Sequence, residues 1–361
     1  MRRTYVVGYF GYKTGQLDGQ TIKTRNVYRL LKEEFDPFVN YFDTQSLRRN
    51  PLSIIKMFFG AIRCNKLVLI PAHNNLKYLF PLFFLLSKLF NFSLLYIAVG
   101  GWLVEYLRHF PIHRKMLSKV QVVFPQTVFM KEQLENNYGF KNVSVLPNFR
   151  MLEQKQINKG TPVNKKNFNI VFFARIHEMK GLDYMAHLAV HISKVYKNKE
   201  IEIDFFGPIH DGSRLFFEKN LLCHSFVSYK GVLSPCEVKH TLSNYDVLVL
   251  PTHYYTEGFP GSVLDAYLSS IPVIVTQWKY AFEFVEECQT GFVIPFDNGT
   301  NQLCEKIDFL YRNPLVLRAM KINAGKKGKS FSPEIASEIL SSFFGQSSSN
   351  KIMNKIFYST L

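Results

Sequence analysis

Residues 246–276 read DVLVLPTHYYTEGFPGSVLDAYLSSIPVIVT and combine a strand, a loop, a short helix and a second strand. The apolar runs at both ends are typical of buried strands in a parallel sheet. Two acids interrupt this pattern: Glu257 stands on the loop, and Asp265 stands on the apolar stretch SVLDAYL. Because ligands bind at the carboxyl ends of parallel strands, this unit predicts an α/β sheet with a polar site at its edge.

The same alternation of strand and helix continues in both directions along the chain. Predicted strands lie at 4–10, 66–71, 93–99, 121–125, 143–148, 169–174, 202–207, 227–231, 246–251, 272–276 and 291–295. Predicted helices lie between them at 21–35, 53–64, 127–137, 181–196, 234–245, 261–269 and near 304–313. This order predicts two Rossmann-like domains whose parallel sheets face a central cleft.

A polar segment without periodicity, residues 150–167, predicts a linker between the two domains. The predicted domains are residues 1–150 and residues 168–335. Residues 336–361 are expected to form a C-terminal helical segment, with packing back on the first domain as one option.

Positive charge is concentrated in the first half of the chain. Residues 1–150 contain 21 Lys and Arg against 8 Asp and Glu, whereas residues 151–361 contain 23 against 20. No acid lies between Asp43 and Glu105, a span that holds Lys56, Arg63, Lys66, Lys77 and Lys88. Such a surface suits anionic lipid or nucleic acid. Because no zinc-finger, RNP or helix-turn-helix signature is present, we favour lipid and expect no nucleic acid partner.

The most hydrophobic segment, residues 79–99, is long enough to suggest a transmembrane helix. Pro81, Lys88 and Asn91 interrupt it, so we interpret it as a helix of about a dozen residues followed by a buried strand. Two roles for this helix stay open: ordinary core packing, and insertion of an apolar face into a bilayer.

The cysteines and histidines give no metal or disulfide signal. Five scattered cysteines without C-x-x-C predict reduced thiols in a cytosolic protein. His187 and His191 stand four residues apart on a predicted helix, but no H-E-x-x-H accompanies them. The N-terminus is predicted to be a first strand rather than a signal peptide.

Charged residues gather where two predicted strands end. Glu257 follows strand 246–251, and Asp265 lies about 6 Å along the next helix, whose free N–H groups attract phosphate. Arg175 and Lys180 follow strand 169–174, and two fixed cations can neutralise a diphosphate without a metal. The chain has no D-x-D motif, and Glu202-Ile-Asp204 is interpreted as structural.

Three segments carry a resemblance to a known family: ARIHEMKG (174–181), GVLSPCEVKHTLSNYDVLVLPT (231–252) and EGFPGSVLDAYLSSIPVIVT (257–276). They resemble the second domain of retaining GT-B glycosyltransferases of family four, with its R-x-x-x-x-K-G loop and its E-x7-E motif, here E-x7-D. The first domain matches loosely, through its strand order and the loop GQLDGQTIK (15–23).

The resemblance implies a GT-B fold and a role for each matching residue. Residues 1–150 would bind the acceptor, and residues 168–335 would bind the nucleotide-sugar donor. The implied contacts are Glu257 with the sugar hydroxyls, Asp265 with the ribose, Arg175 and Lys180 with the diphosphate, and backbone groups of Gly258, Phe259 and Gly261 with sugar and phosphate. Gly19 and Gln20 would close over the phosphates from the first domain.

Two positions depart from the family pattern. Pro260 has no N–H to donate beside the motif. Many relatives have a histidine after the strand that here ends in LLYIAV, where this chain has Gly100-Gly101-Trp102. His73 is the nearest histidine on that side of the sheet, and participation, packing and capping stay open for it. No catalytic base is assigned.

The predicted function is retaining transfer of a sugar from a nucleotide-diphosphate-sugar to an acceptor hydroxyl. The favoured acceptor is a lipid-linked saccharide of bacterial surface polysaccharide (O-antigen or capsule) synthesis, reached by a cytoplasmic protein peripheral on the inner face of the membrane. No cofactor and no metal are expected, with the donor as co-substrate. The alternatives are a soluble transferase acting on a small metabolite and an inactive nucleotide-sugar-binding protein.

Overall fold

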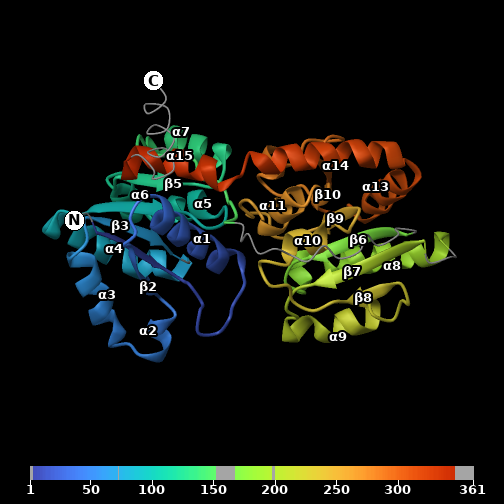
Figure 1. Cartoon of the computed structure of the whole chain (residues 1–361), viewed down its shortest axis with the longest axis horizontal. Coiled ribbons are helices and arrows are strands. Elements are labelled where there is room, and N and C mark those ends of the chain that lie inside the picture. The colour runs from blue at the N-terminus through green and yellow to red at the C-terminus, as the bar shows by residue number, and fades with distance from the viewer. Residues whose placement is uncertain (1–2, 72, 152–166, 197–199, 346–361) are drawn as a thin grey trace, which may run out of the picture. The chain divides into compact units, whose positions relative to one another are not determined.

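The computed structural model describes residues 3–71, 73–151, 167–196 and 200–345 (Figure 1). The chain divides into two compact units, Met1–Met151 with Phe331–Leu361, and Leu152–Ser330. Each unit is an α/β structure on a parallel sheet, as the sequence predicted. Most of the predicted linker, residues 152–166, lies outside the described residues.

The first unit contains a five-stranded parallel sheet in the order β2-β1-β3-β4-β5. The strands are β1 Thr4–Gly8, β2 Asn40–Asp43, β3 Lys66–Ile70, β4 Ser93–Ile97 and β5 Val122–Phe124. The helices are α1 Gly19–Glu34, α2 Ser46–Arg49, α3 Ser53–Ile62, α4 His73–Phe90, α5 Leu103–His109, α6 Pro111–Leu117, α7 Val128–Tyr138 and α15 Pro333–Phe344.

Alternate residues of each strand in this sheet support different helices. On one face, Leu95 of β4 packs in a core with Leu30 of α1 and Leu340 of α15. On the other face, the ring of Tyr96 meets that of Phe80 in α4 at 6.2 Å between centroids. The helix α15 therefore belongs to the first unit, although it follows the second unit in the chain, and residues 346–361 lie outside the described residues.

The second unit contains a six-stranded parallel sheet in the order β11-β10-β9-β6-β7-β8. The strands are β6 Phe168–Phe173, β7 Ile201–Phe206, β8 Val227–Tyr229, β9 Val247–Leu250, β10 Val273–Thr276 and β11 Gly291–Ile294. The helices are η1 Glu178–Lys180, α8 Leu182–Val195, α9 Asp211–Asn220, α10 Val238–Leu242, α11 Gly261–Leu268, α12 Ala281–Phe284, α13 Thr300–Arg312 and α14 Pro314–Lys329.

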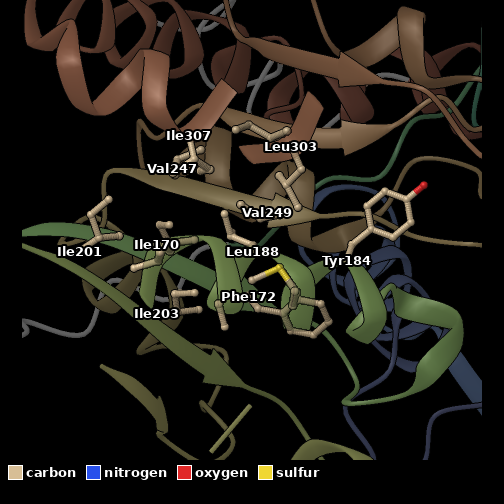
Figure 2. Packing of buried hydrophobic residues seen from close by; sticks show 14 of the residues in the cluster. Ile170, Phe172, Tyr184, Leu188, Ile201, Ile203, Val247, Val249, Leu303 and Ile307 are labelled. Atoms are coloured by element: carbon tan, nitrogen blue, oxygen red, sulfur yellow. The ribbon is translucent and has the colours of Figure 1, made fainter. Parts of the chain in front are cut away.

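In the core of the second unit, side chains of the central strands pack against helices that cover the sheet. Ile170 of β6 and Ile203 of β7 pack with Leu188 of α8 and Ile307 of α13 in one buried cluster (Figure 2). The strands β6, β9 and β10 are covered on both faces and read as apolar runs, which made them visible in the sequence.

Several elements of the first unit differ from the sequence prediction, which did not include the helices α2, α5 and α6. The strand β2, with the sequence NYFD, was missed because it is a short, half-exposed edge strand. Residues 143–148 form no strand; this segment runs beside β5 but makes only one bridge, Val123 to Val143. The helix α4 begins at His73, earlier than expected, and contains Pro81. Among the described residues, no helix combines the length and hydropathy that a membrane span requires.

Candidate functional site

The carboxyl edge of the second sheet has its switch point between β6 and β9. The first strand of the unit, β6, pairs with β7 on one side and with β9 on the other. The chain therefore leaves these two neighbouring strands toward opposite sides of the sheet, which opens a crevice at their ends. The loop after β6 carries Arg175 and Lys180, and the loop after β9 carries Glu257.

An ion pair spans this switch point. The Nζ of Lys180 donates a hydrogen bond to Oε1 of Glu257, and the same Nζ lies 4.8 Å from the ring centroid of Tyr254. Thr252 Oγ1 lies 3.4 Å from Glu257 Oε1, at the limit of a hydrogen bond. The side chains of Lys180 and Glu257 are 21% and 18% exposed, so both charges are accessible to a ligand.

Backbone contacts hold the two loops together. The Met179 carbonyl accepts hydrogen bonds from His253 N at 3.0 Å and from Thr252 Oγ1 at 3.3 Å. Gly181 has a φ of +85°, and a Cβ at this position would lie 2.0 Å from the Pro251 carbonyl oxygen. Only glycine permits this approach, and it places the residue before it, Lys180, beside Glu257.

The helix α11 begins directly after the Glu257 loop. Pro260 occupies its N-cap position and offers no side-chain cap. Asp265 lies in the second turn and is only 8% exposed, so its carboxylate is largely inside the unit. Gly258 is buried and Gly261 is partly exposed at the start of the helix.

The ring of Phe259 stacks on Phe284 with centroids 4.0 Å apart and planes 4° from parallel. This side chain anchors the loop to α12 and is not available to a ligand. The predicted contribution of Phe259 backbone groups stays a prediction.

Arg175 belongs to the same loop as Lys180, whereas Gly19 and Gln20 belong to the first unit. Arg175 is exposed on the loop after β6. Gly19 and Gln20 are the first residues of α1 in the first unit, where Asp18 Oδ1 accepts a hydrogen bond from Thr21 N at 2.9 Å. The amide nitrogen of Gln20 is buried and has no hydrogen-bond partner. The side chain of His73 lies outside the described residues.

Sequence reasoning missed His177, which caps the turn that ends in Lys180, and His210, which contacts His177. The rings of His177 and His210 lie 4.5 Å apart, and His177 Nδ1 accepts a hydrogen bond from Met179 N at 3.0 Å. Burial lowers the pKa of His177, and the neighbouring His210 and Arg175 lower it further. The signal available in the sequence was the position of His177 directly before the turn that ends in Lys180, which His177 caps.

We expect the hydrogen bond from Met179 N to His177 Nδ1 to make the free energy of unfolding depend on pH. Nδ1 accepts a hydrogen bond only when it is unprotonated. Because the folded-state pKa of His177 lies below its ordinary value of 6.5, the stabilisation is complete above that pH and is lost as the pH falls through the folded-state pKa. His177→Asn keeps a capping side chain that does not titrate. In urea unfolding at low pH, this variant should lose about 1 kcal/mol less of its free energy of unfolding than the wild type loses.

The control for this substitution is His240→Asn, a change at an exposed histidine of the same unit. At a pH well above 6.5 it should change the free energy of unfolding by less than about 0.5 kcal/mol, as an exposed substitution usually does. An unaltered pH profile in His177→Asn would contradict the proposed titration of the cap.

Several other polar groups already have structural partners. His191 Nε2 lies 3.0 Å from Asp308, and both side chains are partly exposed, so this histidine already has a structural partner. Asp204 accepts a hydrogen bond from Tyr245 Oη at 2.7 Å. All five cysteines are free thiols. Within the described ranges, no cluster of three or more His, Cys, Asp or Glu side chains is arranged to hold a metal ion.

Comparison with known proteins matches residues 153–328 to the family described as Glycosyl transferases group 1. The capsular polysaccharide biosynthesis glycosyltransferase CapM of Staphylococcus aureus is 26% identical over 212 residues, which are 57% of this chain and 53% of CapM. The chain thus spans about half the length of that relative.

Solved structures share the fold. HepE of Anabaena in complex with UDP-glucose has a TM-score of 0.71 at 14% identity, covering 95% of this chain and 100% of HepE. Sucrose-phosphate synthase of Thermosynechococcus elongatus has a TM-score of 0.69 at 12% identity, covering 99% of this chain and 100% of that chain. The expectation of two α/β domains of the GT-B type is confirmed.

Proposed function

We propose that this protein, whose residues 153–328 match the family described as Glycosyl transferases group 1, transfers a sugar from a nucleotide-diphosphate-sugar to an acceptor hydroxyl. The proposal includes retention of the anomeric configuration. The observation that carries it is the accessible Lys180–Glu257 pair at the switch point of the second sheet.

The ion pair suggests how the site accepts its donor. Without a ligand, Lys180 and Glu257 neutralise each other. A donor diphosphate would attract Lys180 and Arg175, which frees the Glu257 carboxylate to accept hydrogen bonds from sugar hydroxyls. The N–H groups at the start of α11 favour phosphate. The charge that develops on the departing nucleoside diphosphate would then be met by groups already in place.

Three further residues have proposed contacts with the donor. Asp265, buried in α11, would accept hydrogen bonds from the ribose. Gly19 and Gln20 would contact the phosphates from the first unit, and the unpartnered amide of Gln20 supports a polar ligand there. These roles are part of the proposal.

The proposed acceptor is a lipid-linked saccharide of surface polysaccharide synthesis at the inner face of the membrane. The name of CapM and the excess positive charge of residues 1–150 support this choice. A soluble transferase acting on a small metabolite, and an inactive donor-binding protein, are the alternatives. Activity on a soluble acceptor without membrane binding would favour the first of these.

The test is a nucleotide-sugar screen in EDTA, beginning with UDP-sugars because HepE was solved with UDP-glucose. A ligand at about 100 times its Kd stabilises the folded protein by about 2.7 kcal/mol. For a unit of this size the expected rise in Tm is roughly 5–10 °C. Lys180→Met should reduce the shift, whereas Lys327→Met, which breaks the 2.5 Å pair with Glu286, should not.

Turnover of the same donor is expected to survive EDTA, because Arg175 and Lys180 supply the positive charge at the diphosphate. Loss of activity on chelation, with rescue by magnesium or manganese, would contradict this part of the proposal. A screen in which no nucleotide sugar changes Tm would contradict donor binding itself.

A further inference from the structure

The helix α3 and the residue before it expose apolar side chains to solvent. Leu52, Ile55 and Phe59 stand three and four residues apart and are all exposed, with 72% of Leu52 accessible. Met57 and Ala61, on the opposite face of the helix, are fully buried. The helix is therefore apolar on the side that faces the core and also on the side that faces water, which an ordinary surface helix is not.

The helix α4 repeats this arrangement over a greater length. Its exposed residues Tyr78, Leu82, Leu85 and Leu89 follow the spacing i, i+4, i+7, i+11, and Leu85 and Leu89 are 59% and 75% exposed. Its buried residues Leu76, Phe80, Phe83 and Ser87 share the opposite face. This stripe accounts for the unusual hydrophobicity of residues 79–90, which core packing alone does not require.

The helices α3 and α4 cover the same face of the first sheet, and their exposed apolar stripes point away from that sheet. The helices α3 and α4 pack against each other, with the rings of Phe58 and Phe83 6.1 Å apart (Figure 1). The short helix α6 packs beside α4 and adds the exposed Ile112. We call this surface the α3–α4 face; its apolar members are Leu52, Ile55, Phe59, Tyr78, Leu82, Leu85, Leu89 and Ile112.

Cations accompany these apolar residues, and acids do not. Residues 44–104 contain no Asp or Glu, and the exposed cations on these helices are Lys56, Arg63, Lys77, Lys88 and Lys115. Lys88 Nζ lies 5.3 Å from the ring centroid of Phe84, and Lys77 Nζ lies 5.4 Å from that of Tyr78, so their stems run along the apolar surface.

The prediction that Lys66 belongs to this basic surface was wrong. Lys66 is half-buried at the start of β3, where its Nζ donates a hydrogen bond to the Phe343 carbonyl of α15.

We propose that the α3–α4 face docks onto an anionic bilayer, with α3 and α4 lying along the membrane surface. The apolar stripes would enter the boundary between headgroups and acyl chains, and the lysines and arginines would contact anionic headgroups. This deepens the proposed function, because it presents the first unit to a lipid-linked acceptor.

The positive charge of the α3–α4 face favours an anionic bilayer over a second copy of the chain as the binding partner. In a two-fold dimer the same patch meets itself, so the cations of one α3–α4 face would oppose those of the other without an acid between residues 44 and 104 to compensate. An anionic lipid surface satisfies both the cations and the apolar side chains.

The test is co-sedimentation of the full chain with phosphatidylglycerol–phosphatidylcholine vesicles and with pure phosphatidylcholine vesicles. The protein should bind the anionic vesicles, bind the neutral ones much less, and be released by high salt. Leu85→Glu with Leu89→Glu should weaken binding more than tenfold. Lys77→Glu with Lys88→Glu should weaken it at least about 30-fold, since each cation near the surface contributes about 1 kcal/mol.

The matched control is Leu315→Glu with Ile322→Glu on α14 of the second unit, where the two residues are 81% and 54% exposed. This variant should bind vesicles as the wild type does. Equal binding to neutral and anionic vesicles, no binding to either, or an equal loss in the control would overturn the proposal. A concentration-dependent dimer that the Leu85/Leu89 variant abolishes would assign the α3–α4 face to self-association and would also overturn it.

Vesicle binding is measured without a nucleotide sugar, so this test is independent of catalysis. Glu257→Gln should bind vesicles normally. Turnover of the donor without binding to vesicles would overturn only the docking proposal. Binding to vesicles without binding of any donor would overturn only the proposed function.

Discussion

Glu257→Gln is expected to lower sugar transfer by about 10²–10³-fold, the usual cost of removing one group that stabilises charge in a transition state. The substitution keeps the size of the side chain and removes its charge. The free energy of unfolding should change by less than about 1 kcal/mol, because the pair with Lys180 is partly exposed to water. The variant is therefore expected to fold normally and to fail in catalysis.

The measurement compares kcat and kcat/KM of the variant and the wild type with the donor identified by the screen. Glu286→Gln is the matched control, since Glu286 forms a 2.5 Å pair with Lys327 elsewhere in the second unit. It should leave turnover unchanged. Wild-type turnover in Glu257→Gln would remove Glu257 from the proposed site.

Gly181→Ala is expected to destabilise the second unit by roughly 3 kcal/mol or more and to lower activity with it. A left-handed backbone at an alanine costs about 1–2 kcal/mol. The added methyl group would also lie 2.0 Å from the Pro251 carbonyl oxygen, so the ends of η1 and β9 must separate. That movement displaces Lys180 from Glu257.

The substitution Gly231→Ala separates the two causes of destabilisation, the left-handed backbone and the contact with the Pro251 carbonyl oxygen. Gly231 has a φ of +86° in the same unit, but nothing lies within 4 Å of a Cβ at this position. It should show only the backbone cost of about 1–2 kcal/mol and keep full activity. Urea unfolding and turnover of both variants provide the comparison. Equal effects of the two substitutions would show that the contact with Pro251 does not position the site.

The sequence predicted the second unit better than the first, for a physical reason. Central parallel strands are covered on both faces, so β6, β9 and β10 read as short apolar runs between helical patterns. The strand β2 is half-exposed at an edge, and its sequence NYFD has no such pattern. Residues 143–148 contain the apolar alternation of a strand, but they meet β5 at one bridge only.

The sequence by itself determined which residue types stand at the strand ends, including Lys180 before a glycine and Glu257 eight residues before Asp265. Only the tertiary structure decided that Lys180 and Glu257, 77 residues apart, form an ion pair. The reason is strand order: β9 lies beside β6, so the loops that follow them meet. The same holds for residues 1–150, where helix packing turned Lys77 and Lys88 outward and α15 engaged the half-buried Lys66 in a hydrogen bond. Such contacts depend on which elements become neighbours, and local sequence patterns do not contain that information.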